Sequence, residues 1–235
     1  MTLPADVQIR SVGAEQIPVI IWDDFSDQLT QLKLYACEQA CFQPDHQSLY
    51  PGLRAPLPET YVKAFRRKIE PVLRSVYELP EQSNWATVYQ YLSMINRPES
   101  ELAVLQRLPH FDSTAEHSFA LLLYVNPGKF GGTGFFRHRP SGYETVDRQR
   151  FGPFVTAAER HMIRSGPPPA RYTTGSSDHF ELLDTIAYRP NRLLAYPGQL
   201  LHSGLIDPRF DLGADPTQNR LTANLFVRFE QTEAS

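Results

Sequence analysis

The pattern of hydrophobic and polar positions divides the 235-residue chain into two parts. In the first part, the short apolar run from Pro18 to Trp22 is typical of a buried strand. Apolar residues then recur at helical spacing in two stretches. The first begins near a capping residue, Asp24 or Ser26, and ends at about residue 40; the second covers residues 61–76. The first part therefore predicts one strand and two amphipathic helices.

Two features interrupt this helical part. Residues 44–58 are rich in turn-forming residues and predict a loop between the helices. Pro71 falls inside the second helical stretch, where proline removes a backbone donor, so we expect the helix to kink or restart there.

From Trp85 onward the pattern changes to short runs of β-branched and aromatic residues, separated by Pro, Gly, Asn or Asp. The expected strands are residues 85–95, 117–126, 133–139, 186–188, 192–196 and 221–229. A helix at about residues 154–164 and a Gly/Pro/Ser loop at residues 165–178 interrupt the series. The pattern predicts an α+β, mainly β chain: a jelly roll with the N-terminal helices packed on one outer face.

The chain contains no internal repeat, low-complexity tract or long linker, which favours a single domain over residues 1–235. Residues 1–84 then form a helical, mixed support region, and residues 85–235 form the barrel. The barrel carries an insertion at about residues 143–185, for which a lid over the site is one interpretation.

Composition narrows the class of protein. Hydrophobic residues make up 41% of the chain and aromatic residues 11%, which excludes wholesale disorder. A net charge of −3 argues against nucleic acid as a partner, and we expect neither a membrane span nor a secretory signal. Cys37 and Cys41 lie one turn apart if their segment is helical, so we expect reduced core residues. Together these features favour a cytoplasmic, bacterial-type enzyme.

The candidate chemistry centres on two histidines and an aspartate. His110 and Asp112 are two residues apart in LPHFDS, which on a strand places both side chains on one face. His202 follows far downstream, after a probable strand and turn. Two histidines and one carboxylate are the ligand set of non-haem iron(II) oxygenases. The short H-x-D motif also arises by chance, so the interpretation depends on its context.

Arg220 supplies that context, because it opens the run RLTANLFV eighteen residues after His202. Thr222 shares its face of the expected strand, and Tyr124 is in register to approach the arginine. A guanidinium here is suited to bind the distal carboxylate of a dicarboxylic keto acid through two parallel hydrogen bonds.

The motifs resemble the prolyl-hydroxylase-like branch of the 2-oxoglutarate/iron(II) dioxygenase superfamily. The resemblance covers Gln106 to Phe229 and rests on five motifs in the family's order: His110-x-Asp112, Tyr124-Val125-Asn126, Gly131-Gly132-Thr133, His202 and Arg220-x-Thr222. The chain is also similar to uncharacterised bacterial proteins that share YPG-x-RAPLP and PHFDS.

The resemblance implies a double-stranded β-helix with a hydroxylase site. Its implied ligands are iron(II) on His110, Asp112 and His202, and 2-oxoglutarate on Arg220, Tyr124 and Thr222. Retention of Asp112 favours hydroxylation or desaturation over halogenation, since related halogenases give up this carboxylate. We expect a small-molecule, amino-acid or peptide substrate, and both a monomer and a homodimer remain open.

Four further residues are candidate substrate contacts: Tyr50, Arg54, Arg137 and His138. The first two lie in the predicted loop, for which a rigid connector between the helices is the simpler interpretation. Arg137 shares a strand face with Arg139, and either anion binding or solvation explains the pair. His138 is also a rival metal ligand.

Two other classes remain as alternatives. A cupin-like metal-binding barrel needs a further histidine ligand, such as His138, and has no use for Arg220. A non-catalytic jelly-roll binding module is the third interpretation, because a fold alone does not establish a function. The other histidines of the barrel half, His117, His161 and His179, are expected to be structural or solvated.

Overall fold

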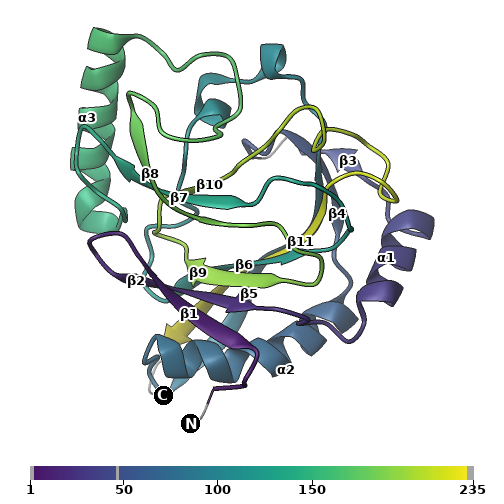
Figure 1. Ribbon diagram of the computed structural model, residues 1–235. Helices are drawn as coiled ribbons and strands as arrows, with labels where there is room; N and C mark the ends of the chain where they lie inside the picture. Colours follow the sequence, from purple (N-terminus) through teal and green to yellow (C-terminus); the bar gives the residue numbers. More distant parts are fainter. Residues whose placement is uncertain (1–2, 46–47, 232–235) are drawn as a thin grey trace.

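The computed structural model describes residues 3–45 and 48–231, and these form two antiparallel sheets flanked by helices (Figure 1). The strands of the larger sheet are β1 (Val7–Val12), β2 (Ile17–Trp22), β3 (Gln43–Pro44), β4 (Gly52–Pro56), β5 (Ser83–Ile95), β6 (Ser118–Tyr124), β9 (Leu193–Pro197) and β11 (Leu221–Gln231). Those of the smaller sheet are β7 (Thr133–His138), β8 (Phe180–Ile186) and β10 (His202–Gly204). The helices are α1 (Leu29–Glu38), α2 (Glu59–Val76) and α3 (Arg148–Ser165), with the short 3₁₀ helices η1 (Glu99–Glu101) and η2 (Val104–Arg107).

The strand order is β1-β2-β9-β6-β11-β5-β4-β3 in the larger sheet and β10-β7-β8 in the smaller one. Long β11 forms the centre, pairing with β6 on one side and β5 on the other. The architecture is the double-stranded β-helix, mainly β with N-terminal helices outside it, as the sequence predicted.

Alternation along the central strands divides the larger sheet into two apolar faces. On β6, Phe119, Leu121 and Leu123 belong to the core on the helical side, whereas Ala120 and Tyr124 belong to the core between the sheets. Successive side chains of a strand point to opposite faces, so one sequence supplies both cores. Both faces are covered, which explains why β6 reads as a continuous apolar run rather than an alternating one.

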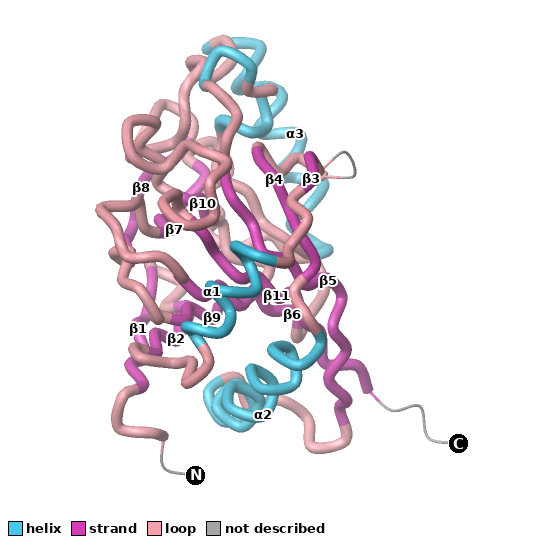
Figure 2. The backbone as a smooth tube through the Cα atoms, turned by 90° about the vertical axis from the view of Figure 1, so that its right-hand side faces the viewer, coloured by secondary structure: helices cyan, strands magenta, loops and turns pink. Residues whose placement is uncertain are grey.

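Helix α2 covers the outer face of the larger sheet with an apolar stripe. Its buried residues are Val62, Phe65, Ile69, Val72 and Leu73, and all belong to the outer core. Burying each such large side chain contributes roughly 1.5–3 kcal/mol. In both Figure 1 and Figure 2, α2 lies below the strands, and α3 lies at the opposite end of the molecule. No helix of the described chain is both long and apolar enough to cross a membrane.

Several sequence predictions are wrong in detail. The expected loop at residues 44–58 contains β4, which pairs with β5 over residues 52–56, and the strand placed at 186–188 instead occupies Phe180–Ile186. β1 was not predicted, and α3 begins at Arg148 rather than near residue 154. Helix α2 continues through Pro71 without interruption. Its flanking residues Ile69 and Val72 are fully packed in the core, so tertiary contacts outweigh the missing hydrogen bond.

The cysteines also differ from expectation. Cys37 and Cys41 are both free thiols, as predicted, but both are exposed rather than part of the core. Helix α1 directs Leu32 and Ala36 inward instead, which leaves Cys37 on the outward side.

Candidate metal centre

His110 and Asp112 are positioned by backbone hydrogen bonds to the segment that carries His202. His110 and His202 form an isolated antiparallel bridge, in which each backbone N–H donates to the other's carbonyl at 2.9 and 2.8 Å. The N–H of Asp112 donates to the carbonyl of Gly198 at 2.7 Å. The two residues therefore lie in a short extended segment rather than in a full strand. Backbone hydrogen bonds thus hold His110 and Asp112 beside His202, although His202 lies about 90 residues further along the chain.

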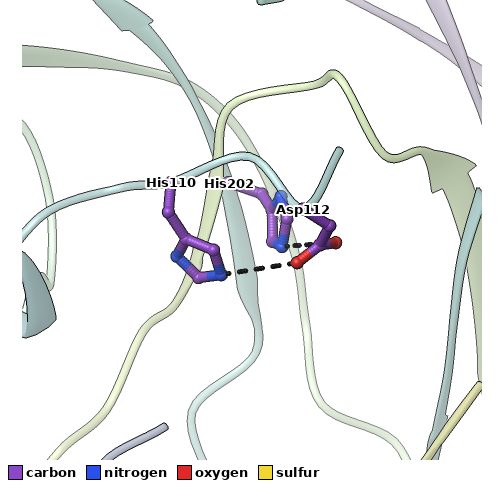
Figure 3. A group of neighbouring side chains, drawn as sticks. All are labelled: His110, Asp112 and His202. Atoms are coloured by element: carbon purple, nitrogen blue, oxygen red, sulfur yellow. Dashed lines mark ion pairs between the residues drawn. The ribbon is translucent and has the colours of Figure 1, made fainter. Parts of the chain in front are cut away.

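The three side chains converge on one point (Figure 3). His110 Nε2 lies 3.8 Å from Asp112 Oδ1, and His202 Nε2 lies 3.5 Å from Asp112 Oδ2. One ligand atom from each residue lies within 4.8 Å of the other two. Two imidazoles and one carboxylate on one side of a common point match the facial triad of non-haem iron(II) sites, with positions left open for other ligands.

The environment keeps both imidazoles in the neutral form that binds metals. Burial lowers the pKa of His202 to about 4. The pKa of His110 is lowered by desolvation of its ring atoms at the cavity and by the neighbouring His202, although its side chain is 56% exposed. Nδ1 of His202 lies 2.8 Å from the carbonyl of Leu200, which accepts only from an N–H, so Nε2 carries the lone pair. Burial raises the pKa of Asp112 to about 6, which still leaves an ionised carboxylate at neutral pH.

A cavity of about 140 Å³ adjoins the triad on the inner side; we call it the inner cavity. It is lined by the triad and by Tyr50, Arg54, Ile95, Ala120, Leu121, Leu122, Thr133, Tyr196, Gly204, Arg220, Thr222, Asn224 and Phe226. Arg220 and Thr222, predicted from the sequence as co-substrate ligands, both belong to this lining.

Arg220 is buried, but only one of its three guanidinium nitrogens is hydrogen-bonded within the described residues. Its Nε donates to the carbonyl of Gly131 at 3.1 Å and lies 3.5 Å from Oδ1 of the fully buried Asp211. Its two terminal nitrogens make no hydrogen bond to the described residues. The guanidinium carbon lies 5.7 Å from the ring centroids of both Tyr124 and Tyr188. Aromatic rings and one anchoring aspartate therefore hold the guanidinium while its terminal nitrogens stay available.

Tyr124 contacts the arginine with its ring rather than its hydroxyl. The hydroxyl group forms a 2.8 Å hydrogen bond with Oγ1 of Thr133, at the start of β7. Two glycines precede that threonine because other backbone passes too close for a side chain. A Cβ on Gly131 would lie 1.6 Å from the carbonyl oxygen of Leu205, and one on Gly132 would lie 2.0 Å from that of Ile186. Neither glycine has a positive φ, so close approach rather than a tight turn requires them.

A second, larger cavity of about 360 Å³ also adjoins His110 and Asp112; we call it the outer cavity. It shares Tyr50, Arg54, Ile95, His110, Asp112 and Gly204 with the inner cavity. The rest of its lining consists of Ser48, Leu49, Pro51, Leu105, Gln106, Leu108, Phe111, Tyr172, Ser203 and Ile206.

Sheet register explains why Arg54 reaches this site from the N-terminal half. Arg54 pairs across the sheet with Ser93, which pairs with Thr222, which in turn pairs with Tyr124. Directly opposed residues of an antiparallel sheet point to the same face. Arg54 therefore lies on the inner face of the larger sheet, in the same row as two predicted co-substrate residues.

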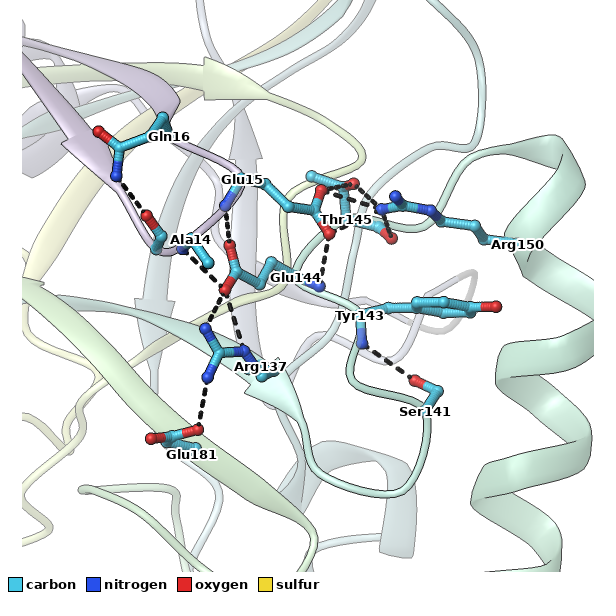
Figure 4. Close-up of polar contacts among 11 residues, drawn as sticks. Ala14, Glu15, Gln16, Arg137, Ser141, Tyr143, Glu144, Thr145, Arg150 and Glu181 are labelled. Atoms are coloured by element: carbon cyan, nitrogen blue, oxygen red, sulfur yellow. Dashed lines mark hydrogen bonds and ion pairs between the residues drawn. The ribbon is translucent and has the colours of Figure 1, made fainter.

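Arg137 and His138 line neither cavity. Arg137 instead pairs with Glu144 and Glu181, as Figure 4 shows, and the carboxylate of Glu144 also accepts the backbone N–H groups of Ala14 and Glu15 at 3.0 and 2.9 Å. His138 is buried, with Nδ1 2.8 Å from the hydroxyl of Ser141 and its ring against Phe154 and Phe180. Among the described residues it does not join the metal-ligand group.

Three residues of the site escaped the sequence analysis: Asp211, Tyr188 and Tyr196. Asp211 accepts from the backbone of Gly131 and Asp207 and anchors Arg220. Tyr188 packs against Tyr124, with ring centroids 4.3 Å apart, and Tyr196 lines the inner cavity. No local pattern distinguishes them, since each acquires its role only through residues distant in the sequence.

Comparison with solved structures relates the fold to known proteins. HygX from Streptomyces hygroscopicus, solved with nickel, 2-oxoglutarate and hygromycin B bound, is 12% identical with a TM-score of 0.50, over 93% of this chain and 83% of that one. An oxidoreductase of the 2OG-Fe(II) oxygenase family from Burkholderia pseudomallei is 7% identical, with a TM-score of 0.45 over 92% and 88% of the two chains. No curated protein matches the sequence.

The chain thus shares the double-stranded β-helix fold of 2-oxoglutarate- and iron(II)-dependent oxygenases. By sequence it belongs to a family of unknown function, DUF6445, which it matches over residues 4–227.

Proposed function

We propose that this protein is an iron(II)- and 2-oxoglutarate-dependent oxygenase that hydroxylates a small-molecule, amino-acid or peptide substrate. The observation that carries the proposal is the inner cavity, because the same space is lined by a two-histidine, one-carboxylate group and by Arg220, whose terminal nitrogens make no hydrogen bond to the described residues. A metal site alone has no need of a buried guanidinium, whereas a dicarboxylate that chelates the metal does.

The donor set fits iron(II) and the cavity fits its co-substrate. His110, Asp112 and His202 would hold the metal, and the two imidazoles are already neutral. Arg220 would pair with the distal carboxylate of 2-oxoglutarate, and the Tyr124 and Tyr188 rings hold its guanidinium in place. Thr222 lines the same space, although its hydroxyl already donates to the carbonyl of Ser93 at 3.4 Å.

When bound, iron and 2-oxoglutarate supply the oxidising power: dioxygen, the co-substrate and a substrate C–H bond give succinate, carbon dioxide and a C–OH group. The protein's part is to place the reactants and to exclude water. The apolar walls of the inner cavity help to exclude water, since Ala120, Leu121 and Tyr196 are nearly inaccessible to solvent.

A cupin-like site is the second candidate, and the structure gives it less support. Within residues 3–45 and 48–231, no fourth histidine, cysteine or carboxylate joins the group. His138, which the sequence offered as a rival ligand, is held by Ser141 and two phenylalanine rings.

Anaerobic titration of the purified protein with iron(II) and then 2-oxoglutarate tests the proposal. We expect a weak visible charge-transfer band once both are present. His110→Ala should abolish iron binding and the band together. Arg220→Ala should retain iron but weaken 2-oxoglutarate binding at least about 100-fold. The charge-assisted pair is lost, and the distal carboxylate of the co-substrate would be buried without a partner.

Arg228→Ala is the matched control, since Arg228 lies on β11, the strand that Arg220 directly precedes, but pairs with Glu230 at the surface. It should titrate as the wild type does. Iron binding without any band on addition of 2-oxoglutarate, or a band that persists unchanged in Arg220→Ala, would contradict the proposal.

A further inference from the structure

We propose that the outer cavity binds a substrate with an apolar body and a carboxylate, and that Arg54 receives the carboxylate. The inference rests on the proposed function, because it assigns the outer cavity to the substrate and the inner cavity to 2-oxoglutarate. It goes further by naming the chemical class of the substrate and the residue that selects it.

The walls of the outer cavity are mainly apolar. Leu49, Leu105, Leu108, Phe111 and Ile206 line it, and the first two are more than half exposed. Exposed leucines at the edge of a pocket that also contains a candidate metal site indicate a surface that an apolar ligand covers. A volume of about 360 Å³ lies within the range of small-molecule sites.

Most polar groups of these walls already have partners within the protein. Gln106 donates to the carbonyl of Leu49 and accepts from Ala103 and Arg97. The hydroxyl of Ser203 donates to the carbonyl of Gly204. These groups therefore offer little to a ligand.

Arg54 is the exception. Its Nη1 donates to Asp45 at 2.5 Å and to Ser48 at 3.1 Å, and its guanidinium lies between the rings of Tyr50 and Tyr91, 4.4 and 4.8 Å from their centroids. Within residues 3–45 and 48–231, neither its buried Nε nor its Nη2 has an acceptor. A buried N–H without an acceptor costs about 1–3 kcal/mol, so this side of the guanidinium favours a ligand that supplies one.

Tyr50 adds a second donor beside the arginine. Its hydroxyl is buried near Ser93 but makes no hydrogen bond of normal geometry. Burial raises its pKa to about 12, so the hydroxyl keeps its proton and remains a donor. A guanidinium edge and a phenol suit a carboxylate, which accepts through two oxygens.

The position of Arg54 places such a ligand next to the triad. Arg54 lines both cavities together with His110 and Asp112, so a carboxylate held there leaves the ligand's body in the outer cavity beside the metal ligands. An ammonium group is disfavoured by the same guanidinium. A phosphate is less suited, because its second negative charge would lie beside the carboxylate of Asp45.

A three-probe comparison tests the inference: octanoate, octanamide and octylamine have the same apolar body and differ at the polar end. Binding is measured in two ways, by the shift each probe causes in the anaerobic iron(II)/2-oxoglutarate band and by calorimetry on the metal-free protein. We expect octanoate to bind at least tenfold more tightly than octanamide, and octylamine to bind least.

Arg54→Gln should remove the preference, lowering octanoate affinity at least tenfold while leaving octanamide within about twofold. Tyr50→Phe should lower octanoate affinity less, and Arg228→Gln, on the far surface of β11, should behave as the wild type. The 2-oxoglutarate band of each variant reports whether its site remains folded.

These measurements distinguish failure of the oxygenase proposal from failure of the carboxylate site. If the band never forms but octanoate still binds selectively to the metal-free protein, the oxygenase proposal fails and the carboxylate site stands. If the band forms but octanoate binds no better than octanamide, or equally well to Arg54→Gln, the carboxylate site is wrong.

Discussion

His138 illustrates how burial changes a residue that the sequence offers as a ligand. It is almost inaccessible to solvent, and the rings of Phe154 and Phe180 lie 4.6 and 5.0 Å from its own. Two more histidines gather beside it: His161 and His179 pack with ring centroids 4.7 Å apart. The sequence predicted that these two are solvated, but His179 is buried, and Nε2 of His161 is also buried, with no hydrogen-bond partner in the described part of the chain.

This environment predicts a pH-dependent stability. Burial, with the neighbouring His161 and His179, lowers the pKa of His138 to about 4 in the folded protein, against about 6.5 when unfolded. Between these values the unfolded chain binds the extra proton, so stability rises with pH and is lost as the pH falls from 6.5 towards 4. We expect His138→Gln to remove about 2 kcal/mol of the loss between pH 6.5 and 4.5.

Urea unfolding of both proteins at a series of pH values measures this difference. Parallel pH profiles for the wild type and His138→Gln would show that His138 does not contribute to the acid sensitivity.

At the scale of elements, β7 and α3 show opposite requirements for glycine. Gly132 stands at the entry to β7, where the carbonyl of Ile186 leaves no room for a Cβ. Gly152 lies within α3, and a Cβ there would meet nothing within 4 Å. The same substitution should therefore cost much more at Gly132 than at Gly152.

We expect Gly132→Ala to lower the free energy of unfolding by roughly 2 kcal/mol or more, because backbone must shift where β7 pairs with β8. Gly152→Ala should change it by less than about 1 kcal/mol, since the helix preference of alanine over glycine is offset by the crowding between its Cβ and the ring of Pro153. Chemical denaturation of the two variants provides the comparison. An unchanged free energy of unfolding in Gly132→Ala would mean that the two strands separate more easily than their contact suggests.

At the scale of the whole molecule, the N-terminal region completes the barrel instead of standing beside it. β2 pairs with β9 and β4 pairs with β5, so both halves of the chain contribute to one sheet. Helix α2 supplies five buried residues to the core beneath that sheet. Without residues 1–82, β9 and β5 each lose a pairing strand, and the outer core is left uncovered.

We therefore expect a chain that begins at Ser83 not to fold cooperatively, although it carries all three triad residues. The full-length protein should unfold in a single transition when followed by near- and far-ultraviolet circular dichroism. The truncated chain should show no such transition and should bind a hydrophobic dye. Cooperative unfolding of the truncated chain would mean that residues 83–235 form an independent domain.

The candidate site shows where prediction from sequence reaches its limit. His110, Asp112, His202 and Arg220 were selected because their residue types and order suit one chemistry, and the structure brings all four to the inner cavity. Arg54 remained ambiguous, because a loop was expected where β4 forms. Asp211 was not recognised at all, since its role depends on Arg220 and Gly131 lying beside it.

The sequence by itself determined the class of fold and the central strands, because the apolar runs of β6 and β11 can be buried on both faces only inside a layered β structure. It also determined the ligand types, since these follow from the chemistry of individual side chains. Only the tertiary structure decided the register that aligns Arg54 with Ser93, Thr222 and Tyr124, and the burial that changes the role of His138. These features depend on contacts between distant residues, which no local pattern encodes.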